Sequence, residues 1–284
     1  MRRALLTLCL GLVTATAKAH YVDLEQALIR DRVLTFGLAL VGEPFSYRRD
    51  GTIRGFEVAV AKAVAAAHDL ELRLVRLARD EMKRALDDGR VDAVNSLALA
   101  AGDRALSILP YLRVGDHVMI LKGNPFRIRT PDDLSGRVVA ATSGSTAEIY
   151  ARALNDRFLT AGRPAMHIHT FPEQRHTHFP VSMGHASAYF VKSVSAVGIS
   201  RDPHARTRLL PGAFQPRREA GFALKPDNRV LHHAVEHAVA AMVATGKHER
   251  LMRQFGLPIE LSPFPRDGDH QSGPGSAATV PAEK

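Results

Sequence analysis

Short apolar segments of two kinds alternate along the first third of the chain. Residues 33–40, 70–77 and 91–94 are predicted strands; the first is apolar except for Thr35, and the second alternates apolar and charged residues as a half-covered strand does. Between them, residues 55–67 and 81–88 carry apolar residues at helical spacing, and Gly89 ends the second of these helices. A polar helix near residues 23–30 precedes them. The order strand, helix, strand, helix, strand predicts a parallel sheet with crossover helices.

The same alternation then repeats. Further strands are predicted at residues 114–121, 137–141, 166–171, 186–191 and 219–224. Helices are predicted at residues 146–159, in a polar stretch that ends near Gly184, and on both sides of Gly246 within residues 230–255. We therefore predict an α/β fold of two doubly wound lobes. A ligand cleft is expected between them, at the carboxyl ends of the strands, where open α/β sheets bind ligands.

The first 19 residues have the features of a secretory signal. Arg2 and Arg3 form a basic start, residues 4–17 are an apolar stretch too short to span a bilayer, and residues 17–19 are a small-x-small cleavage site. Cleavage would also remove Cys9, the single cysteine, so disulfides and thiol chemistry are not expected in the mature chain. We expect an exported, periplasmic protein.

Charge and composition argue against two other classes of protein. The net charge is +9, and removal of Arg2, Arg3 and Lys18 with the signal leaves +6. This charge is spread without a dense basic run or interleaved aromatic residues, which argues against nucleic-acid binding. No later apolar run is long enough for a membrane span, so we do not expect an integral membrane protein. Residues 267–284 are rich in Gly, Ser, Pro and Ala and are predicted to be disordered.

Five short segments in a fixed order carry a resemblance to a known family. They are Gly55-Phe56-Glu57-Val58, Gly89-Arg90-Val91-Asp92-Ala93, Asp103-Arg104, Leu134-Ser135-Gly136-Arg137-Val138 and Gly144-Ser145-Thr146-Ala147-Glu148. Over residues 33–258 the chain resembles the periplasmic solute-binding proteins of polar amino-acid ABC transporters, solute-binding protein family 3. The resemblance implies the type II periplasmic-binding-protein fold, with two crossover strands, one near Lys122 and one near Arg217. The first lobe would comprise residues 20–122 and 217–262, and the second lobe residues 123–216.

The same resemblance implies a function. The protein would be a monomer that closes on a small polar or anionic solute, an amino acid or a carboxylate, and presents it to an inner-membrane ABC permease. It would need no cofactor.

The resemblance also implies a site for the ligand's carboxylate. Arg104 stands where the family clamps the α-carboxylate with an arginine, and Thr146 where a threonine binds the same group from the other lobe. A guanidinium suits this role because it donates two parallel bonds to a carboxylate; the alternative is a surface arginine that pairs with Asp103. Ser145 and Thr146 also open a predicted helix, whose free amides favour an anion, although Ser145 could serve only as the N-cap. Ser96 matches a position that lines the cleft.

The positions that hold the ligand's ammonium group in the family are changed. The acidic residue expected after the strand at 186–191 is Lys192, and the first-lobe acidic position is Ala39. Arg79 stands where an aromatic residue stacks on the ligand side chain. Other departures are Gly42 at an aromatic position and Leu97 and Leu99 at hydroxyl positions. The cleft is therefore expected to prefer anions that lack an α-ammonium group.

An alternative explanation for these departures is a shift of the loops. In that case Glu43, Asp80 or Ser193 would take the place of the missing acidic residue.

Histidine is frequent, with 14 residues, five of them between His167 and His185. His167 and His169 would share one face of a strand, and His233 and His237 lie one helical turn apart, spacings that can bind zinc or copper. No Cys, Asp or Glu completes a recognised metal motif with them. We therefore expect surface histidines and no bound metal.

Two other functions are compatible with the sequence. One is an accessory or sensor protein of the same fold, with a degenerate pocket, that binds a periplasmic partner such as an oxidoreductase system. The other is a dehydratase-like enzyme that uses Glu148 or Glu173 as general acid. The chain has no nucleophile elbow, phosphate-binding glycine loop or His-Glu-x-x-His motif. We therefore do not expect an enzyme and assign no catalytic residue.

Overall fold

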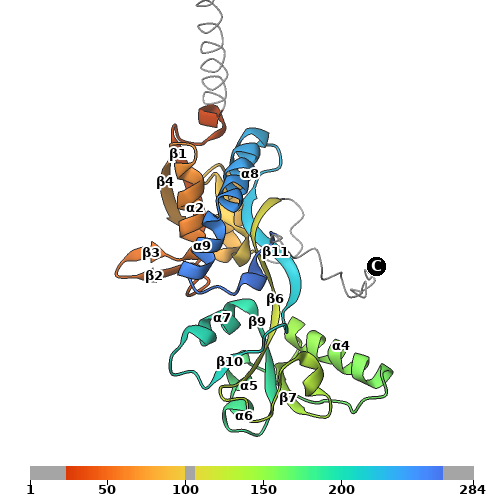
Figure 1. Ribbon diagram of the computed structural model, residues 1–284. Coiled ribbons are helices and arrows are strands. Elements are labelled where there is room, and N and C mark those ends of the chain that lie inside the picture. Colours follow the sequence, from red (N-terminus) through yellow and green to blue (C-terminus); the bar gives the residue numbers. More distant parts are fainter. Residues whose placement is uncertain (1–23, 100–105, 265–284) are drawn as a thin grey trace, which may run out of the picture.

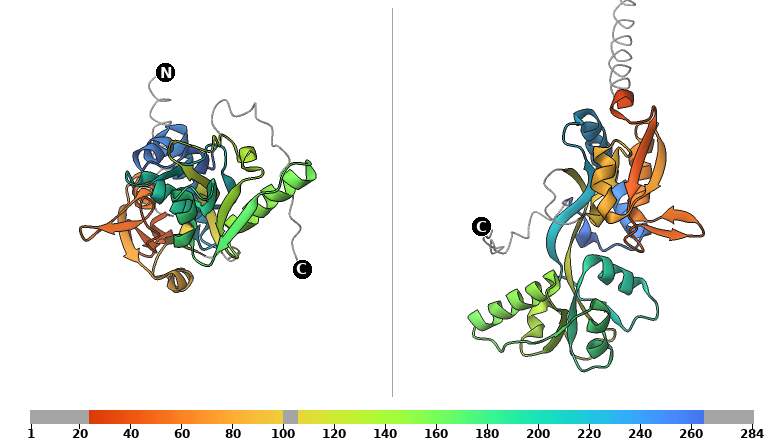
Figure 2. Two further views of the ribbon diagram at one scale, coloured as in Figure 1. Left: turned by 90° about the horizontal axis from the view of Figure 1, so that it is seen from below. Right: turned by 180° about the vertical axis from the view of Figure 1, so that it is seen from behind.

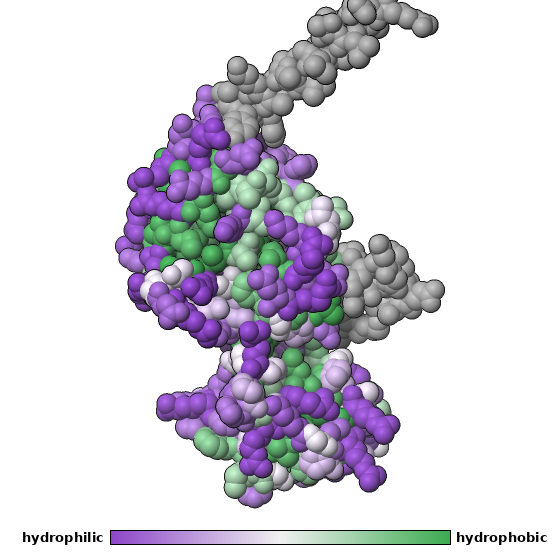
Figure 3. Space-filling view, turned by 60° about the vertical axis from the view of Figure 1, so that its left-hand side comes forward, coloured by the Kyte–Doolittle hydropathy of each residue, from purple (hydrophilic) through white to green (hydrophobic). Residues whose placement is uncertain are grey.

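The computed structural model describes residues 24–99 and 106–264, and these form two lobes, one above the other in Figure 1. The first lobe, drawn above, contains β1 to β5 and α8 and α9; the second contains β7 to β10 and α4 to α7. The molecule narrows between them (Figure 3). The α/β fold of two lobes is thus confirmed. The predicted signal at residues 1–19, the tail at 267–284 and Arg104 lie outside the described residues. Among the described helices, none is long and apolar enough to cross a membrane.

Parallel strands form the centre of each lobe, as predicted. In the first lobe, β1 (Val33–Leu38) pairs in parallel with β4 (Glu71–Arg76) on one side and β5 (Ala93–Asn95) on the other. In the second lobe, β7 (Val138–Thr142) pairs in parallel with β8 (His167–Phe171) and β9 (Ala188–Lys192).

Two long antiparallel strands join the lobes into one continuous sheet. β6 (Ser107–Leu121) pairs with β11 (Gln215–Leu224), and the strand order is β4-β1-β5-β11-β6-β9-β7-β8. β10 (Thr207–Leu209) pairs with the end of β6. β11 also pairs with β5, and β6 with β9, both antiparallel. The lobe boundaries near Lys122 and Arg217 stay predictions, because each long strand runs from one lobe into the other.

The two connecting strands approach each other closely at Gly115. A Cβ atom at this position would lie 1.9 Å from the carbonyl oxygen of Gln215, so only glycine fits. The pairing of β6 with β11 is irregular at the same place, with a register shift between Pro216 and Arg218. The crossing between the lobes is therefore a bulged, tightly packed pair of strands.

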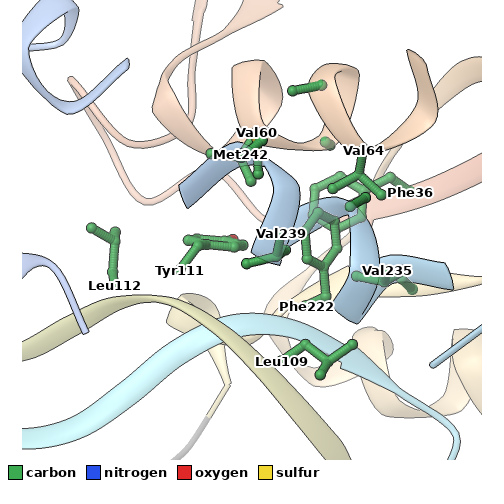
Figure 4. Packing of buried hydrophobic residues seen from close by; sticks show 14 of the residues in the cluster. Phe36, Val60, Val64, Leu109, Tyr111, Leu112, Phe222, Val235, Val239 and Met242 are labelled. Carbon is green, nitrogen blue, oxygen red and sulfur yellow. The ribbon is translucent and has the colours of Figure 1, made fainter. Parts of the chain in front are cut away.

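Helices cover both faces of the first-lobe sheet. α2 (Phe56–Ala66), α8 (Arg229–Ala244) and α9 (Lys247–Gln254) contribute to the larger core, and α3 (Met82–Asp87) packs on the other face. In the larger core the rings of Phe36, Tyr111 and Phe222 come from three strands; Phe222 lies between the other two, at 5.2 and 5.3 Å between ring centroids (Figure 4). Two helices around Gly246 were predicted, and Gly246 is the N-cap of α9.

The second lobe is layered in the same way. α4 (Thr146–Thr160) packs on one face of its sheet through Ala147, Ala151 and Leu154. On the other face lie α6 (Phe179–Ser182) and α7 (Ser193–Arg201), with α5 (Gln174–Thr177) beside them. The right-hand view of Figure 2 shows both layers from behind.

The structure contains elements that the sequence patterns did not predict. They are the hairpin of β2 (Tyr47–Arg49) and β3 (Thr52–Arg54), the first half of β6, β10 and α7. The hairpin turns at Asp50 and Gly51, both with positive φ, which is a turn that an Asp-Gly pair favours.

Candidate ligand-binding site

A cleft of about 430 Å³ lies between the lobes. Residues at or just after the carboxyl ends of β1, β4, β5, β7 and β9 line it, together with the crossing of β6 and β11. Its volume is near the lower end of the range for ligand pockets, which suits a small solute. Among the described residues, four cationic side chains line it, Arg79, Lys192, Arg217 and Arg218, beside apolar Val41, Leu97 and Leu99.

Three of the residues predicted from the sequence meet in this cleft. Arg79 begins a short helical turn after β4, Thr146 is the first residue of α4, and Lys192 is the last residue of β9. They therefore come from both lobes.

Lys192 and Arg79 are the two cleft cations for which the described residues provide no counter-charge. Within residues 24–99 and 106–264, neither side chain forms a hydrogen bond or an ion pair, and no acidic side chain lines the cleft. Lys192 is exposed at the end of β9 in the second lobe, and Arg79 is exposed after β4 in the first lobe; both line the cleft.

Two other predicted residues have local structural roles. Ser145 is the N-cap of α4: its hydroxyl accepts a hydrogen bond from the Glu148 amide and donates to the Thr142 carbonyl. Ser96 is 1% exposed, and its hydroxyl accepts a hydrogen bond of 2.7 Å from the Gly221 amide. Neither lines the cleft.

The Thr146 hydroxyl is already engaged. It donates to a carboxylate oxygen of Asp116 at 2.9 Å, and Asp116 is fully buried on β6. A hydroxyl has one proton to donate, so in this arrangement Thr146 can offer an anion only its backbone amide. The start of α4 also holds an anion of its own, since the Glu148 carboxylate accepts from the Gly144 amide.

Two arginines of the cleft were not predicted as site residues. Arg217 Nε lies 3.0 Å from a carboxylate oxygen of Asp116. The buried carboxylate of Asp116 therefore neutralises the positive charge of Arg217. Arg218 donates to the carbonyl oxygens of Ser96 and Leu97, each at 3.0 Å. The only sequence signal for them was the predicted crossover near Arg217.

A buried carboxylate supports the first-lobe wall. Glu57 accepts hydrogen bonds from Ser46, Asn95 and Tyr111 at 2.7, 2.9 and 3.0 Å. The Asn95 side chain also bonds the amide and carbonyl of Ala39, so the ends of β1 and β5 are fixed together. Burial raises the pKa of Glu57, and its three hydrogen bonds and the charge of Arg218 oppose that shift.

A buried histidine supports the second-lobe wall. His117 is 4% exposed, stacks on Phe214 at 4.7 Å and lies 3.1 Å from the Ser193 hydroxyl. Burial lowers the pKa of His117 to about 4, so its ring is neutral at neutral pH. Ser193 also bonds both backbone groups of Gly115, which ties the start of α7 to the crossing.

Comparison with known proteins assigns this architecture to a family. The family model for bacterial extracellular solute-binding proteins, family 3, matches residues 34–258. The chain belongs to this family. The resemblance seen in the sequence is thereby confirmed.

Relatives of this family 3 protein include two from Escherichia coli K12. The L-cystine-binding protein TcyJ is 27% identical over 269 residues, which cover 91% of this chain and 97% of TcyJ. The histidine-binding periplasmic protein is 22% identical over 264 residues, which cover 90% of this chain and 97% of that protein.

Solved structures show the same fold. The second substrate-binding domain of Lactococcus lactis GlnP, in an open conformation, has a TM-score of 0.67 at 16% identity and covers 79% of this chain and 95% of that one. The unliganded L-cystine solute receptor of Neisseria gonorrhoeae has a TM-score of 0.65 at 19% identity, and the match covers 81% of this chain and 94% of the receptor.

Of the three possible replacements for an ammonium-binding acid in this family 3 protein, two lie outside the cleft lining and the third is already hydrogen-bonded. Glu43 forms an exposed ion pair with Arg49 at 2.8 Å and does not line the cleft, nor does Asp80. Ser193 lines the cleft, but its hydroxyl bonds Gly115 and lies beside His117.

The two candidate general acids are also poorly suited to catalysis. Glu148 forms an ion pair with Arg152 and accepts a hydrogen bond from the Gly144 amide. Both contacts lower the pKa of Glu148, which is the opposite of what a general acid needs. Glu173 pairs with Arg175 on the exposed surface. Members of family 3 are solute-binding proteins, which agrees with a role without catalysis.

Proposed function

We propose that this protein is the substrate-binding component of an ABC importer and that it binds a small solute with two anionic groups in the cleft between the lobes. The observation that carries this proposal is a pair of cations for which residues 24–99 and 106–264 offer no partner, Lys192 on the second lobe and Arg79 on the first. A dianion would bring one negative group to each. Membership of family 3 supports the importer role, and the relative TcyJ is named for binding L-cystine.

The same cations disfavour a zwitterionic amino acid. Two like charges 4 Å apart repel each other by about 4 kcal/mol at the effective dielectric constant near a protein surface. An ammonium group beside Lys192 would meet this repulsion, with no carboxylate from the described residues in the cleft lining to offset it. A tenfold loss of affinity corresponds to about 1.4 kcal/mol, so the repulsion is large enough to decide selectivity.

Binding would be coupled to closure of the lobes. We assign residues 20–122 and 217–262 to one lobe and residues 123–216 to the other, with a hinge where β6 and β11 cross. A ligand that contacts Arg79 and Lys192 at once stabilises only the closed arrangement. The closed monomer, exported to the periplasm by the segment at residues 1–19, would then dock on an inner-membrane permease.

Calorimetry with matched ligands tests the proposal. L-Cystine is compared with dithiodipropionate, which is cystine without its two ammonium groups, and glutamate with glutarate. We expect the two deaminated acids to bind more tightly, by at least about tenfold, since they keep both carboxylates and lose the repulsion. Lys192→Gln should remove most of this binding.

Lys62→Gln is the matched control, because Lys62 is an exposed cation on α2 that does not line the cleft. It should leave every affinity unchanged. Tight binding of L-cystine with no binding of dithiodipropionate would overturn the anionic ligand. Absence of binding for all four compounds, and for a wider set of carboxylates, would overturn the use of this cleft.

A further inference from the structure

Helix α8 brings three metal-ligating side chains together on the outside of the first lobe. They are His232, His233 and Glu236, and their ligand atoms all lie within 4.8 Å of one another. α8 lies at the end of the first lobe that faces away from the second lobe (Figure 1). This cluster, here called the α8 cluster, is therefore independent of the cleft and of the function proposed for it.

The spacing of the α8 cluster is close to that of metal ligands. Glu236 Oε2 lies 3.5 Å from His233 Nδ1 and 3.9 Å from His232 Nδ1. Two ligand atoms on a tetrahedral zinc ion, each about 2.0–2.1 Å from the metal, are roughly 3.4 Å apart. Both observed distances are longer than an ordinary hydrogen bond, so no hydrogen bond fixes the carboxylate to either ring.

The backbone that carries these side chains is fixed. Asn228 caps α8 by accepting from the Leu231 amide, and Leu231, Val235 and Val239 are buried in the core. The His233 and Glu236 side chains leave the helix away from this core and that of His232 lies on its flank, so a metal would have to order only their rotamers.

Exposure differs within the α8 cluster. The His232 side chain is 28% exposed, whereas those of His233 and Glu236 are 74% and 58% exposed. A metal bound here would keep at least one coordination position open to water.

We propose that His232, His233 and Glu236 bind a divalent first-row transition metal, with zinc as the probe ion. Two imidazoles and one carboxylate are a ligand set that zinc uses, and the carboxylate offsets part of the charge of the ion. Calcium and magnesium prefer sets made of oxygen ligands alone, so they should not compete. His237 is the alternative to Glu236 as a ligand, because it follows His233 by one helical turn.

Zinc titration of the purified protein without a histidine tag tests this site. Calorimetry should give one zinc ion per chain, and zinc should raise the melting temperature, because it binds the folded state. Glu236→Gln keeps the size of the side chain but weakens it as a ligand; this variant and His232→Ala should each weaken binding by at least about tenfold. Histidine ring signals in NMR spectra should shift for His232 and His233.

Two control variants make the outcome decisive. The double change His167→Ala with His169→Ala removes the other spaced pair, on the exposed edge strand β8, and should have no effect. His237→Ala should have little effect. If His237→Ala abolishes binding while Glu236→Gln does not, the site is a His233–His237 pair and the proposal is wrong. It is also wrong if zinc does not bind or binds only through β8.

Discussion

The Arg217 guanidinium lies 3.0 Å from the Asp116 carboxylate, and these two residues sit on the two strands that join the lobes. Asp116 is fully buried, whereas the Arg217 side chain is 31% exposed to the cleft. The pair therefore fixes β11 to β6 at the crossing and neutralises one of the cations that line the cleft. The Thr146 hydroxyl, 2.9 Å from Asp116, connects α4 to the same point.

Removal of Arg217 should leave a buried charge without its partner. We expect Arg217→Met to lower the free energy of unfolding by about 3 kcal/mol, measured by urea denaturation. The double variant with Asp116→Asn should recover part of this loss, because the buried charge is then gone. Arg152→Met removes the 61% exposed partner of Glu148 and should cost no more than about 0.5 kcal/mol. Equal losses in both single variants would contradict a special role for the crossing.

Gly115 should not tolerate a methyl group. Gly115→Ala would place Cβ 1.9 Å from the Gln215 carbonyl oxygen, and we expect a loss of at least about 2 kcal/mol in unfolding free energy. Gly198→Ala is the control: Gly198 lies inside α7, its nearest neighbour would be 3.5 Å away, and the helix should gain up to about 1 kcal/mol. A stable Gly115→Ala protein would show that the two strands separate easily.

His117 should make the protein acid-sensitive. Its pKa is about 4 in the folded protein against 6.5 ordinarily, so the unfolded chain takes up a proton that the folded chain refuses. The stabilisation that comes from keeping His117 neutral is then fully present above about pH 6.5. As the pH drops to about 4, the free energy of unfolding falls by up to roughly 3 kcal/mol. Urea denaturation across this range measures it.

The comparison that isolates His117 uses two variants. His117→Phe should flatten the acid side of the stability profile, whereas His185→Gln, at an exposed histidine, should leave the profile unchanged. Differences between profiles are needed, because the raised pKa values of Glu57 and Asp92 act in the opposite direction. An unchanged profile in His117→Phe would refute the assignment.

Reversal of the charge at Lys192 should change ligand preference. Lys192→Asp places a carboxylate at the second-lobe position where an ammonium group would lie, so we expect the ratio of L-cystine to dithiodipropionate affinity to rise by at least about tenfold. Isothermal calorimetry of both ligands gives the ratio. Lys62→Asp, outside the cleft, should not change it.

The sequence was informative where a local pattern fixes the element. β1, β4, α2 and α4 were predicted within two residues at each end, because apolar spacing and the Ser145 cap are local features. The first half of β6 was missed because Pro110 argues against a strand, yet Pro110 lies at a register shift opposite Gly221 where a proline is tolerated. α7 was missed because Gly198 and its serines weaken the helical pattern.

The residues of the site could likewise be predicted only where a local pattern places them. Thr146 and Lys192 could be placed because each follows a predicted strand, and both line the cleft. Ser96 could not be oriented, since the irregular pairing between Ala220 and Gly221 decides where its hydroxyl points. The contact of Arg217 with Asp116 joins residues 101 positions apart and depends on the register of β11, which no local pattern shows.

The position of β11 has a consequence for synthesis of the chain. In the sheet β11 fills the place between β5 and β6, and α8 and α9 complete the first-lobe core, so this lobe cannot assemble until its final segments leave the ribosome. All strands from β6 to β10 end by Leu209, so the second lobe can fold while the first still exposes the edges of β5 and β6. Those edges offer free backbone groups to other chains during translation. The first lobe, although begun earlier, is therefore the part that most needs protection from aggregation before release.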